Sequence, residues 1–421
     1  MLNLLKDVEF PLIPVIADLE AHGYLIDCGF FRDLQQKILE IQNKLLPEMR
    51  NLAGRDLNPN SASDLGRCFY QELGLPVLKK TSNGQPSTDQ KTLDLLVEKH
   101  PLVPMVLEWK KLSKVLSTYC GFQDRVGPDH RLRPSYNQVG TVTGRLTAGY
   151  GIQTIPKRDN FGIRRGFVAP EGFTIVAADF DQQEMFVLAS VSGDENLLQA
   201  IKDGQDLHGL AAKLVFGLDC GPNEVKSLHE DQRNQVKTIQ FGIIYGSGPD
   251  SIGQTLGIGA SEAASLIDVY FSRFPKIQEF INACHHAVNK RLEITDIFGR
   301  RRVFKKPRSK ADATAMLREA QNFPIQAAGA SITKLAMIKT FHHIKANHPD
   351  IRMILSLHDE LQFEVPDKDV VHFATELPSL MTNLGLDAYG FKVPLEVEVR
   401  SGKTWGDLKR GFIGDLSSGN F

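Results

Sequence analysis

Residues 233–246 read RNQVKTIQFGIIYG, a stretch that repeats a cation or an aromatic ring every four residues. On a helix with about 100° per residue, positions at this spacing share one face. The four side chains on that face are Arg233, Lys237, Phe241 and Tyr245. A core helix would carry Leu or Val there, whereas cations bind phosphates and aromatic rings stack on bases. The stretch therefore predicts a helix that binds a phosphate chain beside a flat ring, with a solvated helix face whose aromatics tuck inward as the alternative.

The size and charge of the chain limit the classes of protein to which it can belong. Its 421 residues are too many for one compact core, so we expect two or three domains. The formal net charge is −1, with 49 Lys and Arg against 50 Asp and Glu, which excludes a protein that is basic over its whole surface. Any nucleic-acid-binding surface must therefore be local. The hydrophobic fraction of 42% is that of a globular chain.

The cysteines and the N-terminus do not indicate a metal site, a disulfide framework or a membrane anchor. Five cysteines lie far apart without a Cys-x-x-Cys pair, which argues against a zinc knuckle and a disulfide framework. Cys284-His285-His286 has no partner at ligand spacing, so we assign it to a helix surface. The N-terminus lacks a basic segment followed by an apolar run, and no stretch reaches membrane-spanning length. We therefore expect no membrane association and, by default, a cytoplasmic location in a reducing compartment.

Carboxylates end two predicted strands that lie far apart in the chain. Residues 173–178, FTIVAA, are a β-branched apolar run typical of a buried strand, and the run ends at Asp179. Residues 353–366 predict a strand, a two-residue turn and a second strand, with Asp359 and Glu360 at the tip. If the fold brings the two groups together, their oxygens suit Mg²⁺. Two such ions about 3.5–4 Å apart can activate an attacking 3′ oxygen and stabilise a leaving pyrophosphate, as nucleotidyl transfer requires.

Polar and basic side chains gather in further segments. From Arg131 to Arg165 the pattern changes to short extended pieces rich in Arg, Gln and Asn, side chains suited to minor-groove or sugar-phosphate contacts. A polar loop region is the alternative. A helical block over 196–306 overlaps the cationic run FGRRRVFKKPR at 298–308. Beyond it, three more polar side chains recur at four-residue spacing: Arg318, Asn322 and Gln326.

In order and spacing, these motifs resemble those of the polymerase domain of the bacterial DNA polymerase I family, family A, along nearly the whole chain. DFDQQE at 179–184 is similar to motif A, 233–246 to motif B and HDE at 358–360 to motif C. STY at 117–119 and TGRL at 143–146 also fall in order. The resemblance implies an α+β right-hand polymerase with an antiparallel palm sheet and helical fingers and thumb. Its expected parts are palm entry 1–30, thumb 31–125, palm with motif A 126–195, fingers with motif B 196–306 and palm with motif C 307–421.

The resemblance also implies an activity and a set of site residues. The activity is DNA-templated extension of a primer 3′-OH with dNTPs, on a DNA primer-template, by a monomer of bacterial or phage-like origin. It implies two Mg²⁺ ions, for which Mn²⁺ can substitute. The implied metal ligands are Asp179, Asp359 and the Phe180 carbonyl, with Glu360 as a supporting catalytic carboxylate and Lys237 as a catalytic proton donor. The implied nucleotide-binding residues are Arg233, Lys237, Phe241, Tyr245, Glu184, Gln183 and His208, with Glu184 as the steric gate against a 2′-hydroxyl. The implied primer-template residues are Arg145, Gln153, Thr154, Arg318, Asn322, Gln326 and His358.

Some positions depart from the family pattern. Motif A usually reads DYSQIELR, whereas residues 179–186 read DFDQQEMF, which places Gln183 beside the gate. The loop after Arg145 is one residue shorter than is usual, and Thr154 follows Gln153 where Asn is usual. Because the match begins at the start of the chain, we expect neither a 5′ nuclease nor a 3′–5′ exonuclease domain.

Two other functions compete with a DNA polymerase. A single-subunit RNA polymerase shares the metal-binding aspartates, but it has no use for a bulky gate such as Glu184. A catalytically inactive, polymerase-like nucleic-acid-binding module is the other alternative. The intact Asp179, Asp359, Arg233 and Lys237 disfavour it.

Overall fold

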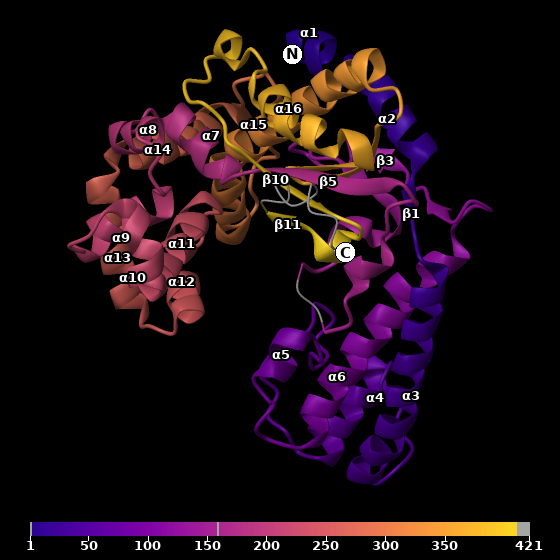
Figure 1. Ribbon diagram of the computed structural model, residues 1–421. Coiled ribbons are helices and arrows are strands. Elements are labelled where there is room, and N and C mark those ends of the chain that lie inside the picture. Colours follow the sequence, from indigo (N-terminus) through magenta and orange to yellow (C-terminus); the bar gives the residue numbers. More distant parts are fainter. Residues whose placement is uncertain (1, 158–159, 411–421) are drawn as a thin grey trace.

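A five-stranded antiparallel sheet lies at the centre of the molecule (Figure 1). The computed structural model describes residues 2–157 and 160–410, so the predicted palm limits at Met1 and Phe421 lie outside the described residues. In order across the sheet the strands are β11 (Lys409–Arg410), β10 (Val397–Gly402), β5 (Phe173–Phe180), β9 (Glu360–Pro366) and β8 (Arg352–Leu357). The predicted buried strand is β5, and the predicted hairpin is β8 with β9. The antiparallel sheet with its surrounding helices confirms the α+β class.

β5 is buried on both of its faces. Val176 and Ala178 are 0% exposed and belong to the main core, together with Phe363 of β9. Ile175 points to the opposite face, where it joins a second cluster with Tyr24. A strand enclosed on both sides reads in sequence as a near-continuous apolar run rather than as an alternation. This double burial accounts for the continuous apolar run before Asp179.

Helices cover one face of the sheet. α2 (Phe10–His22) and α16 (Val370–Thr382) pack against its strands, and α15 (Lys310–Asn347) packs against both of these helices. α7 (Gln183–Ser192) follows β5 and packs on α15. The middle of α15 is made of small residues, and a Cβ atom at Gly329 would lie 2.8 Å from Oε1 of Gln183. The missing side chain therefore allows α7 to approach α15 closely.

A helical lobe follows α7 and forms the left-hand side of Figure 1. Its helices are α8 (Glu195–Lys202), α9 (Leu207–Phe216), α10 (Val225–Leu228), α11 (Glu230–Ile244), α12 (Pro249–Leu256), α13 (Ala260–Arg273) and α14 (Pro275–Arg291). A small hairpin of β6 (Glu293–Thr295) and β7 (Arg301–Val303) follows them. Buried Tyr270 and Phe274 belong to the same continuous core as the sheet, so apolar packing joins this lobe to the sheet and its covering helices.

A second helical lobe extends below the sheet in Figure 1. It contains α3 (Cys28–Ala53), α4 (Ala62–Gly66), α5 (Gln90–Asp94) and α6 (Leu102–Lys114). The Asp27 side chain caps α3 by accepting the Phe30 N–H at 3.0 Å, and the helix ends at Gly54, whose φ is 66°. A separate core that includes Phe69 and Trp109 holds the outer part of this lobe together. Whether the two lobes are fingers and thumb stays a prediction.

Short elements complete the fold. They are α1 (Leu2–Leu4) and two antiparallel pairs, β1 (Tyr24–Leu25) with β2 (Arg131–Leu132) and β3 (Tyr136–Asn137) with β4 (Thr147–Ala148). All five cysteines are free thiols, as expected for a chain without a disulfide framework. Among the residues described, none of the helices combines the length and the apolar character that crossing a membrane requires.

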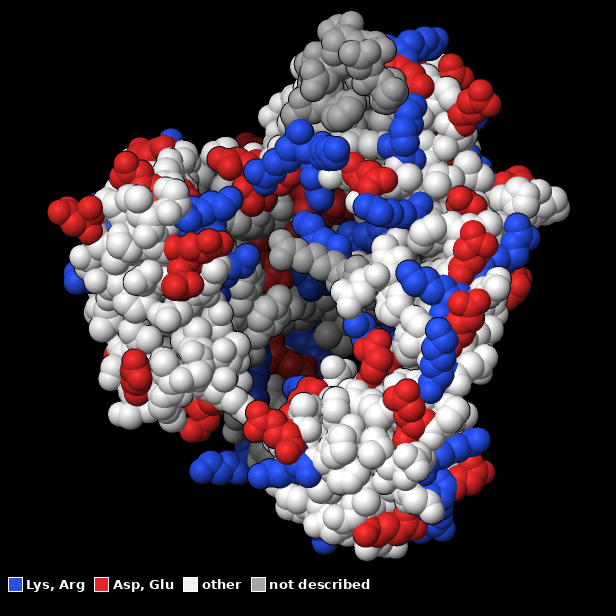
Figure 2. Space-filling model, turned by 60° about the horizontal axis from the view of Figure 1, so that its bottom comes forward, with Lys and Arg blue, Asp and Glu red and all other residues white. Residues whose placement is uncertain are grey.

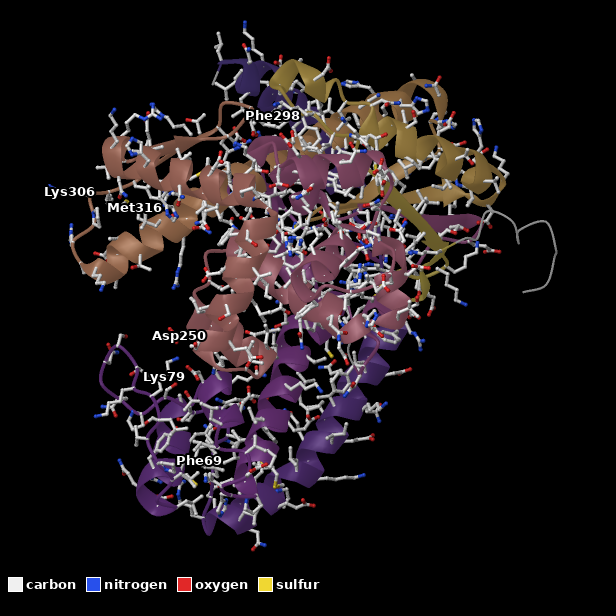
Figure 3. The ribbon with its side chains drawn as sticks, turned by 90° about the vertical axis from the view of Figure 1, so that its left-hand side faces the viewer. Phe69, Lys79, Asp250, Phe298, Lys306 and Met316 are labelled. Carbon is white, nitrogen blue, oxygen red and sulfur yellow. The ribbon has the colours of Figure 1, made fainter. Side chains whose placement is uncertain are left out.

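The molecule is hollowed between the lobes and the sheet, and Figure 2 shows basic and acidic side chains around this hollow. Two basic loops stand at its edges: Lys79 lies on a loop of the lower lobe and Lys306 on the loop before α15 (Figure 3). Lys79 is paired with Asp89 at 2.7 Å. In the cationic run, Arg301 and Arg302 are also paired with carboxylates, whereas the cations that follow are exposed: Lys305, Lys306 and Arg308. Only part of the predicted basic run is therefore open to a ligand.

Candidate active site

The carboxylates that lie far apart in the chain meet at one edge of the central sheet. Asp179, near the end of β5, is the register partner of Glu360, the first residue of β9. The Phe180 N–H donates to the Asp359 carbonyl oxygen at 3.3 Å, which brings Asp359 to the same edge. His358 and Asp359 form the turn between β8 and β9, and the φ of 58° at His358 is of the kind that two-residue hairpin turns use.

Negative charge accumulates at this edge. Burial raises the pKa of Asp179 to about 7, and the charges of Asp359 and Glu360 add to the rise. Burial also raises the pKa of Asp359 above its ordinary value. Arg400 opposes the rise at Asp179 only in part, with Nη2 3.4 Å from Oδ2 of Asp179. A cluster whose negative charge is not cancelled by the protein favours a bound cation.

Arg400 is a site residue that the sequence did not reveal. It lies in β10, where Glu398 is the register partner of Asp179, and side chains two residues apart on a strand share a face. Nη2 of Arg400 therefore reaches Oε2 of Glu360 at 2.5 Å. Glu360 is also held by Gln362, whose Nε2 donates to Oε1 at 2.5 Å. A single Arg in a strand belongs to no recognisable sequence motif. Its partners become apparent only when β10 pairs with β5.

The donor set at this edge fits a hard divalent cation. Three carboxylates gather there, and oxygen ligands of this kind are the ones that Mg²⁺ and Mn²⁺ prefer in proteins. The side chain of Asp179 is 29% exposed, so it is accessible from solvent. The raised pKa of Asp179 shows that its charged form is poorly compensated by the surrounding protein. A bound cation would supply that compensation.

Helix α11 turns its cationic and aromatic stripe away from the core. Lys237 and Tyr245 are exposed and Phe241 is half-buried, whereas Val236 and Ile239 on the opposite face are 0% exposed. The rings of Phe241 and Tyr245 stack with centroids 6.4 Å apart and planes at 21°. Nζ of Lys237 lies 5.9 Å from the centroid of Phe241. The predicted helix is confirmed, and the exposed Tyr245 does not tuck into the core.

A pocket of about 420 Å³ lies beside this face and reaches the residues that follow β5. Its lining carries Lys226, Arg233 and Lys237 from α10 and α11. Arg233 is held in place by Asp206, to which its Nε and Nη2 donate at 2.5 and 3.0 Å. Lys226 and Asp206 are further site residues that the sequence did not reveal. Neither of them lies on α11, because Lys226 belongs to the preceding helix α10 and Asp206 precedes α9.

His208 lies beneath the aromatic stripe, at the edge of the pocket. It is 2% exposed, its ring centroid is 5.8 Å from that of Phe241, and its Nδ1 is hydrogen-bonded to Oε1 of Gln240. Burial lowers the pKa of His208 to about 4, so the ring is neutral at physiological pH. A neutral, buried imidazole supports Phe241 and Gln240 from below and does not offer a charge to a phosphate.

Glu184 connects α7 to the aromatic stripe and to the loop before β4. The hydroxyl of Tyr245 donates to Oε1 and Oε2 of Glu184 at 3.1 and 2.9 Å. Nη2 of Arg145 lies 2.6 Å from Oε1 of Glu184. Burial raises the pKa of Tyr245 to about 12, with the charge of Glu184 adding to the rise, so the hydroxyl stays protonated and can donate. Three residues from separate predicted motifs thus form one hydrogen-bonded group.

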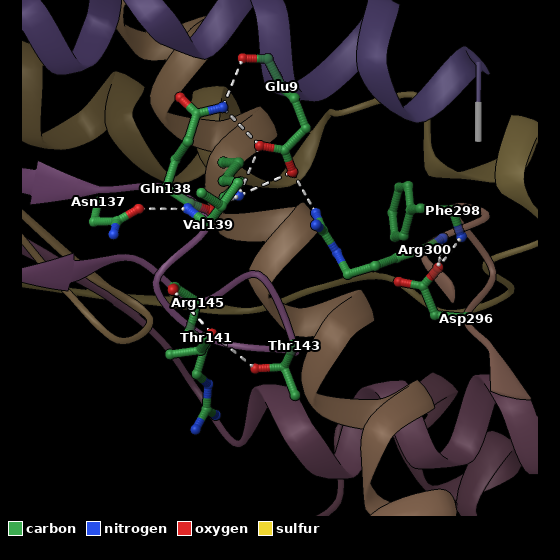
Figure 4. Close-up of polar contacts among 11 residues, drawn as sticks. Glu9, Asn137, Gln138, Val139, Thr141, Thr143, Arg145, Asp296, Phe298 and Arg300 are labelled. Carbon is green, nitrogen blue, oxygen red and sulfur yellow. Dashed lines mark hydrogen bonds and ion pairs between the residues drawn. The ribbon is translucent and has the colours of Figure 1, made fainter. Parts of the chain in front are cut away.

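A buried ionic network anchors the loop that leads to Arg145 (Figure 4). Nζ of Lys334, which is 1% exposed, donates to both carboxylate oxygens of Glu9 at 2.9 and 3.0 Å. Arg300 also pairs with Glu9. Gln138 joins the network twice: its Nε2 donates to Glu9 at 2.9 Å, and its carbonyl accepts from Lys334 at 3.1 Å. The network therefore ties this loop to α15 and to the segment between β6 and β7.

Comparison with known proteins agrees with this geometry. A family model described as DNA polymerase family A matches residues 29–407. The chain belongs to the family A DNA polymerases. It is 37% identical over 413 residues to the thermostable DNA polymerase I of Thermus aquaticus, a match that covers 96% of this chain and 48% of that protein. It is 34% identical over 422 residues to DNA polymerase I of Helicobacter pylori, covering 97% of this chain and 44% of that protein.

A solved structure shares the fold as well as the sequence pattern. The POL domain of Pol1 from M. smegmatis, in complex with DNA primer-template and dNTP, matches with a TM-score of 0.87 at 30% identity. The match covers 96% of this chain and 71% of that one. The chain spans about half the length of the curated polymerase relatives that it matches.

Two of the amides assigned to primer-template binding in this family A polymerase serve internal contacts. Oε1 of Gln153 accepts a backbone N–H at 3.0 Å, and its Nε2 donates to the carbonyls of Leu146 and Ser356 at 3.3 Å. Asn322 is 9% exposed and donates to the Ile244 carbonyl at 3.3 Å. A sequence cannot separate such internal uses from contacts with DNA, because both need the same amide. Other residues of the set remain open: Arg318, Thr154 and His358 are exposed, and Gln326 is half-buried.

Gln183 faces the interior of the polymerase instead of the nucleotide side. It is 5% exposed, and its Nε2 donates to Oγ1 of Thr333 in α15 at 3.2 Å. Contact between Gln183 and substrate stays a prediction, and in this structure the side chain is buried against α15. Adjacent helical positions point in different directions, so when Glu184 faces Tyr245, its neighbour turns toward α15.

Proposed function

We propose that this chain is a DNA-templated DNA polymerase that extends a primer 3′-OH with dNTPs and acts as a monomer. The observation that carries the proposal is that two features lie next to each other. Asp179, near the end of β5, and Asp359 form the carboxylate edge, and the residues that directly follow β5 line a pocket together with the cationic face of α11. The fold shared with a polymerase domain solved with DNA primer-template and dNTP supports the proposal.

The side of the pocket formed by α10 and α11 offers a triphosphate three cations. Lys226, Arg233 and Lys237 line it, and cations of this kind form charge-assisted hydrogen bonds to phosphate oxygens. Arg233 would exchange the carboxylate of Asp206 for the phosphate, so its guanidinium is oriented before the nucleotide arrives. Phe241 would then pack against the sugar and base of that nucleotide. Lys237, the exposed cation of the stripe, would donate a proton to the leaving pyrophosphate.

Asp179, Asp359 and the Phe180 carbonyl would hold Mg²⁺, which when bound activates the 3′ oxygen and stabilises the leaving pyrophosphate. Arg400 would keep Glu360 in place beside them through its 2.5 Å ion pair. Glu184, fixed by Tyr245 and Arg145, would bar a 2′-hydroxyl from the sugar site. The Glu184 side chain cannot rotate away without breaking its hydrogen bonds to Tyr245 and Arg145, so its position is fixed, as selection against a 2′-hydroxyl requires.

Primer extension with Mg²⁺ tests this function. Asp359→Asn should reduce extension at least about 100-fold, because an oxyanion ligand is lost from the reacting centre. Primer-template binding, followed by fluorescence anisotropy, should stay nearly unchanged. Asp350→Asn is the matched control, since Asp350 is an exposed acid just before β8, at the far end of the same hairpin. An Asp359→Asn variant that keeps a tenth of the wild-type rate contradicts the assignment.

The same assay separates DNA polymerase from RNA polymerase. Reactions with dNTPs and with NTPs, on DNA and on RNA templates, should show extension with dNTPs on DNA. Preferred use of NTPs by the wild-type chain would contradict the gate assigned to Glu184. Absence of any extension by a folded chain that binds primer-template would support an inactive binding module instead.

A further inference from the structure

Three histidines and one glutamate gather on the helical side of the palm, where α15 ends and α16 begins. Nε2 of His343 and Nε2 of His348 lie 3.2 and 3.1 Å from the same oxygen, Oε2 of Glu376. Nε2 of His372 lies 3.3 Å from the other oxygen, Oε1. The polymerase assignments above use none of these side chains.

The cluster is formed by residues at fixed positions on two packed helices. His372 and Glu376 stand four residues apart on α16, so they share a face. His343 is in the last turns of α15, and His348 caps the end of that helix. The rings of His343 and His348 lie with centroids 5.3 Å apart, and those of His348 and His372 with centroids 5.6 Å apart. Three imidazoles thus converge on one carboxylate from two packed helices.

The distances are those of a compact metal site. One ligand atom each from His343, His348 and Glu376 all lie within 4.8 Å of one another. In a tetrahedral zinc site, with ligands about 2.0–2.1 Å from the ion, neighbouring ligand atoms are about 3.3 Å apart. The observed separations between nitrogen and oxygen match this value, so an ion could enter with small side-chain rotations.

We infer that this cluster binds Zn²⁺ through His343, His348 and Glu376, whose ligand atoms lie together, with the exposed side chain of His372 rotating inward to become the fourth ligand. Imidazole ligands favour Zn²⁺ over Mg²⁺, so the site would differ in metal preference from the carboxylate edge. The ion would fasten the end of α15 to α16.

Titration with Co²⁺ tests the site, because tetrahedral Co²⁺ absorbs visible light far more strongly than octahedral Co²⁺. The probe is Co²⁺ added to the full chain, freed of any affinity tag, in excess Mg²⁺ that occupies the carboxylate edge. Zn²⁺ is then added to displace the Co²⁺. We expect tetrahedral bands that saturate at one ion per chain and disappear on addition of Zn²⁺.

Variants identify the ligands. His348→Ala should weaken Zn²⁺ binding at least about tenfold and abolish the tetrahedral bands. His372→Gln is the safeguard against a folding defect, because the His372 side chain is 68% exposed, and it should weaken binding as well. His342→Ala is the matched control, an exposed histidine in the same helical turn that lies outside the cluster, and it should bind like the wild type.

Thermal unfolding gives a second readout. Zn²⁺ should raise the unfolding temperature of the wild type and of His342→Ala but not that of His348→Ala, because a ligand stabilises the state that binds it. Equal Zn²⁺ affinities in the wild type, His348→Ala and His372→Gln would overturn the inference. Weak octahedral Co²⁺ bands in the wild type would do the same, and the cluster would then be three imidazoles hydrogen-bonded to a carboxylate.

Discussion

The carboxylate edge should destabilise the metal-free protein, and Asp179→Asn should relieve that cost. In the folded chain, burial and the charges of Asp359 and Glu360 raise the pKa of Asp179 from 3.8 to about 7. The folded protein therefore holds a proton at pH values where the unfolded chain has released it. Stability conferred by that proton is present below pH 4 and is lost as the pH rises to about 7.

The expected size follows from the same values. Each pKa unit corresponds to about 1.4 kcal/mol, so the rise at Asp179 sets a ceiling of about 4 kcal/mol at pH 8. The Asn variant also loses the 3.4 Å contact with Arg400, so we expect a net gain of about 2–4 kcal/mol. At roughly 2 °C per kcal/mol, the unfolding temperature should rise by about 4–8 °C. The variant should thus be more stable and inactive.

Scanning calorimetry in EDTA at pH 5 and pH 8 checks this reasoning. The gain from Asp179→Asn should be largest at pH 8 and should fall to about 1–2 kcal/mol at pH 5, where the folded carboxyl keeps its proton but the unfolded one, with a pKa of 3.8, has released it. Mg²⁺ at pH 8 should stabilise the wild type and narrow the difference, since only the wild type retains the full ligand set. Asp350→Asn, an exposed acid outside the site, should melt like the wild type at both pH values. A gain of equal size at pH 5 and pH 8, or no gain at pH 8, would refute the argument.

Three further substitutions test separate contacts. Glu9→Gln should lower the free energy of unfolding by about 3–5 kcal/mol, because it leaves the buried ammonium of Lys334 without its carboxylate; denaturant titration measures this, and a loss below about 1 kcal/mol would contradict it. Arg400→Gln should tighten Mg²⁺ binding severalfold in calorimetric titration, because it removes a positive charge 3.4 Å from Asp179; weaker binding would show that Arg400 preserves the ligand geometry instead. Glu184→Ala should raise NTP incorporation relative to dNTP at least about tenfold in single-turnover assays, because the space for a 2′-hydroxyl opens; an unchanged ratio would remove the gate from this position.

The sequence predicts those features whose signal is local. The apolar run before Asp179 identifies a strand because the strand is buried on both faces, and the four-residue stripe identifies α11 because its cations and rings share one exposed face. The antiparallel pairing of β5 with β9 then brings the carboxylates together. Pairing of this kind is a long-range choice, and no spacing within either strand encodes it. The resemblance to a known family implies this pairing instead.

The sequence alone does not distinguish between the two possible roles of a polar side chain near the site. Gln183 and His208 are polar residues near the site, and an interior role and a substrate role need the same chemical groups. In the structure both side chains are buried, at 5% and 2% exposure, and their substrate roles stay predictions. Arg400 shows the converse case, because a strand arginine without a motif becomes part of the site through the register of β10. Each of these outcomes depends on packing between elements that are distant in the chain.

Helix α15 illustrates why the sequence does not reveal such contacts. It makes polar contacts with other elements at three positions along its length. Near its start, Gln321 donates to the Ile243 carbonyl at the end of α11 at 2.6 Å, which fixes the helix that carries the phosphate-binding stripe. In its middle, Lys334 holds Glu9 and, through Gln138, the loop to Arg145. At its end, His343 reaches α16. Polar groups on a buried helix are costly unless they are paired, so each marks a place where another element must dock. Because these partners lie on distant elements, α15 fixes both α11 and the loop to Arg145 through polar side chains that do not fit an amphipathic pattern.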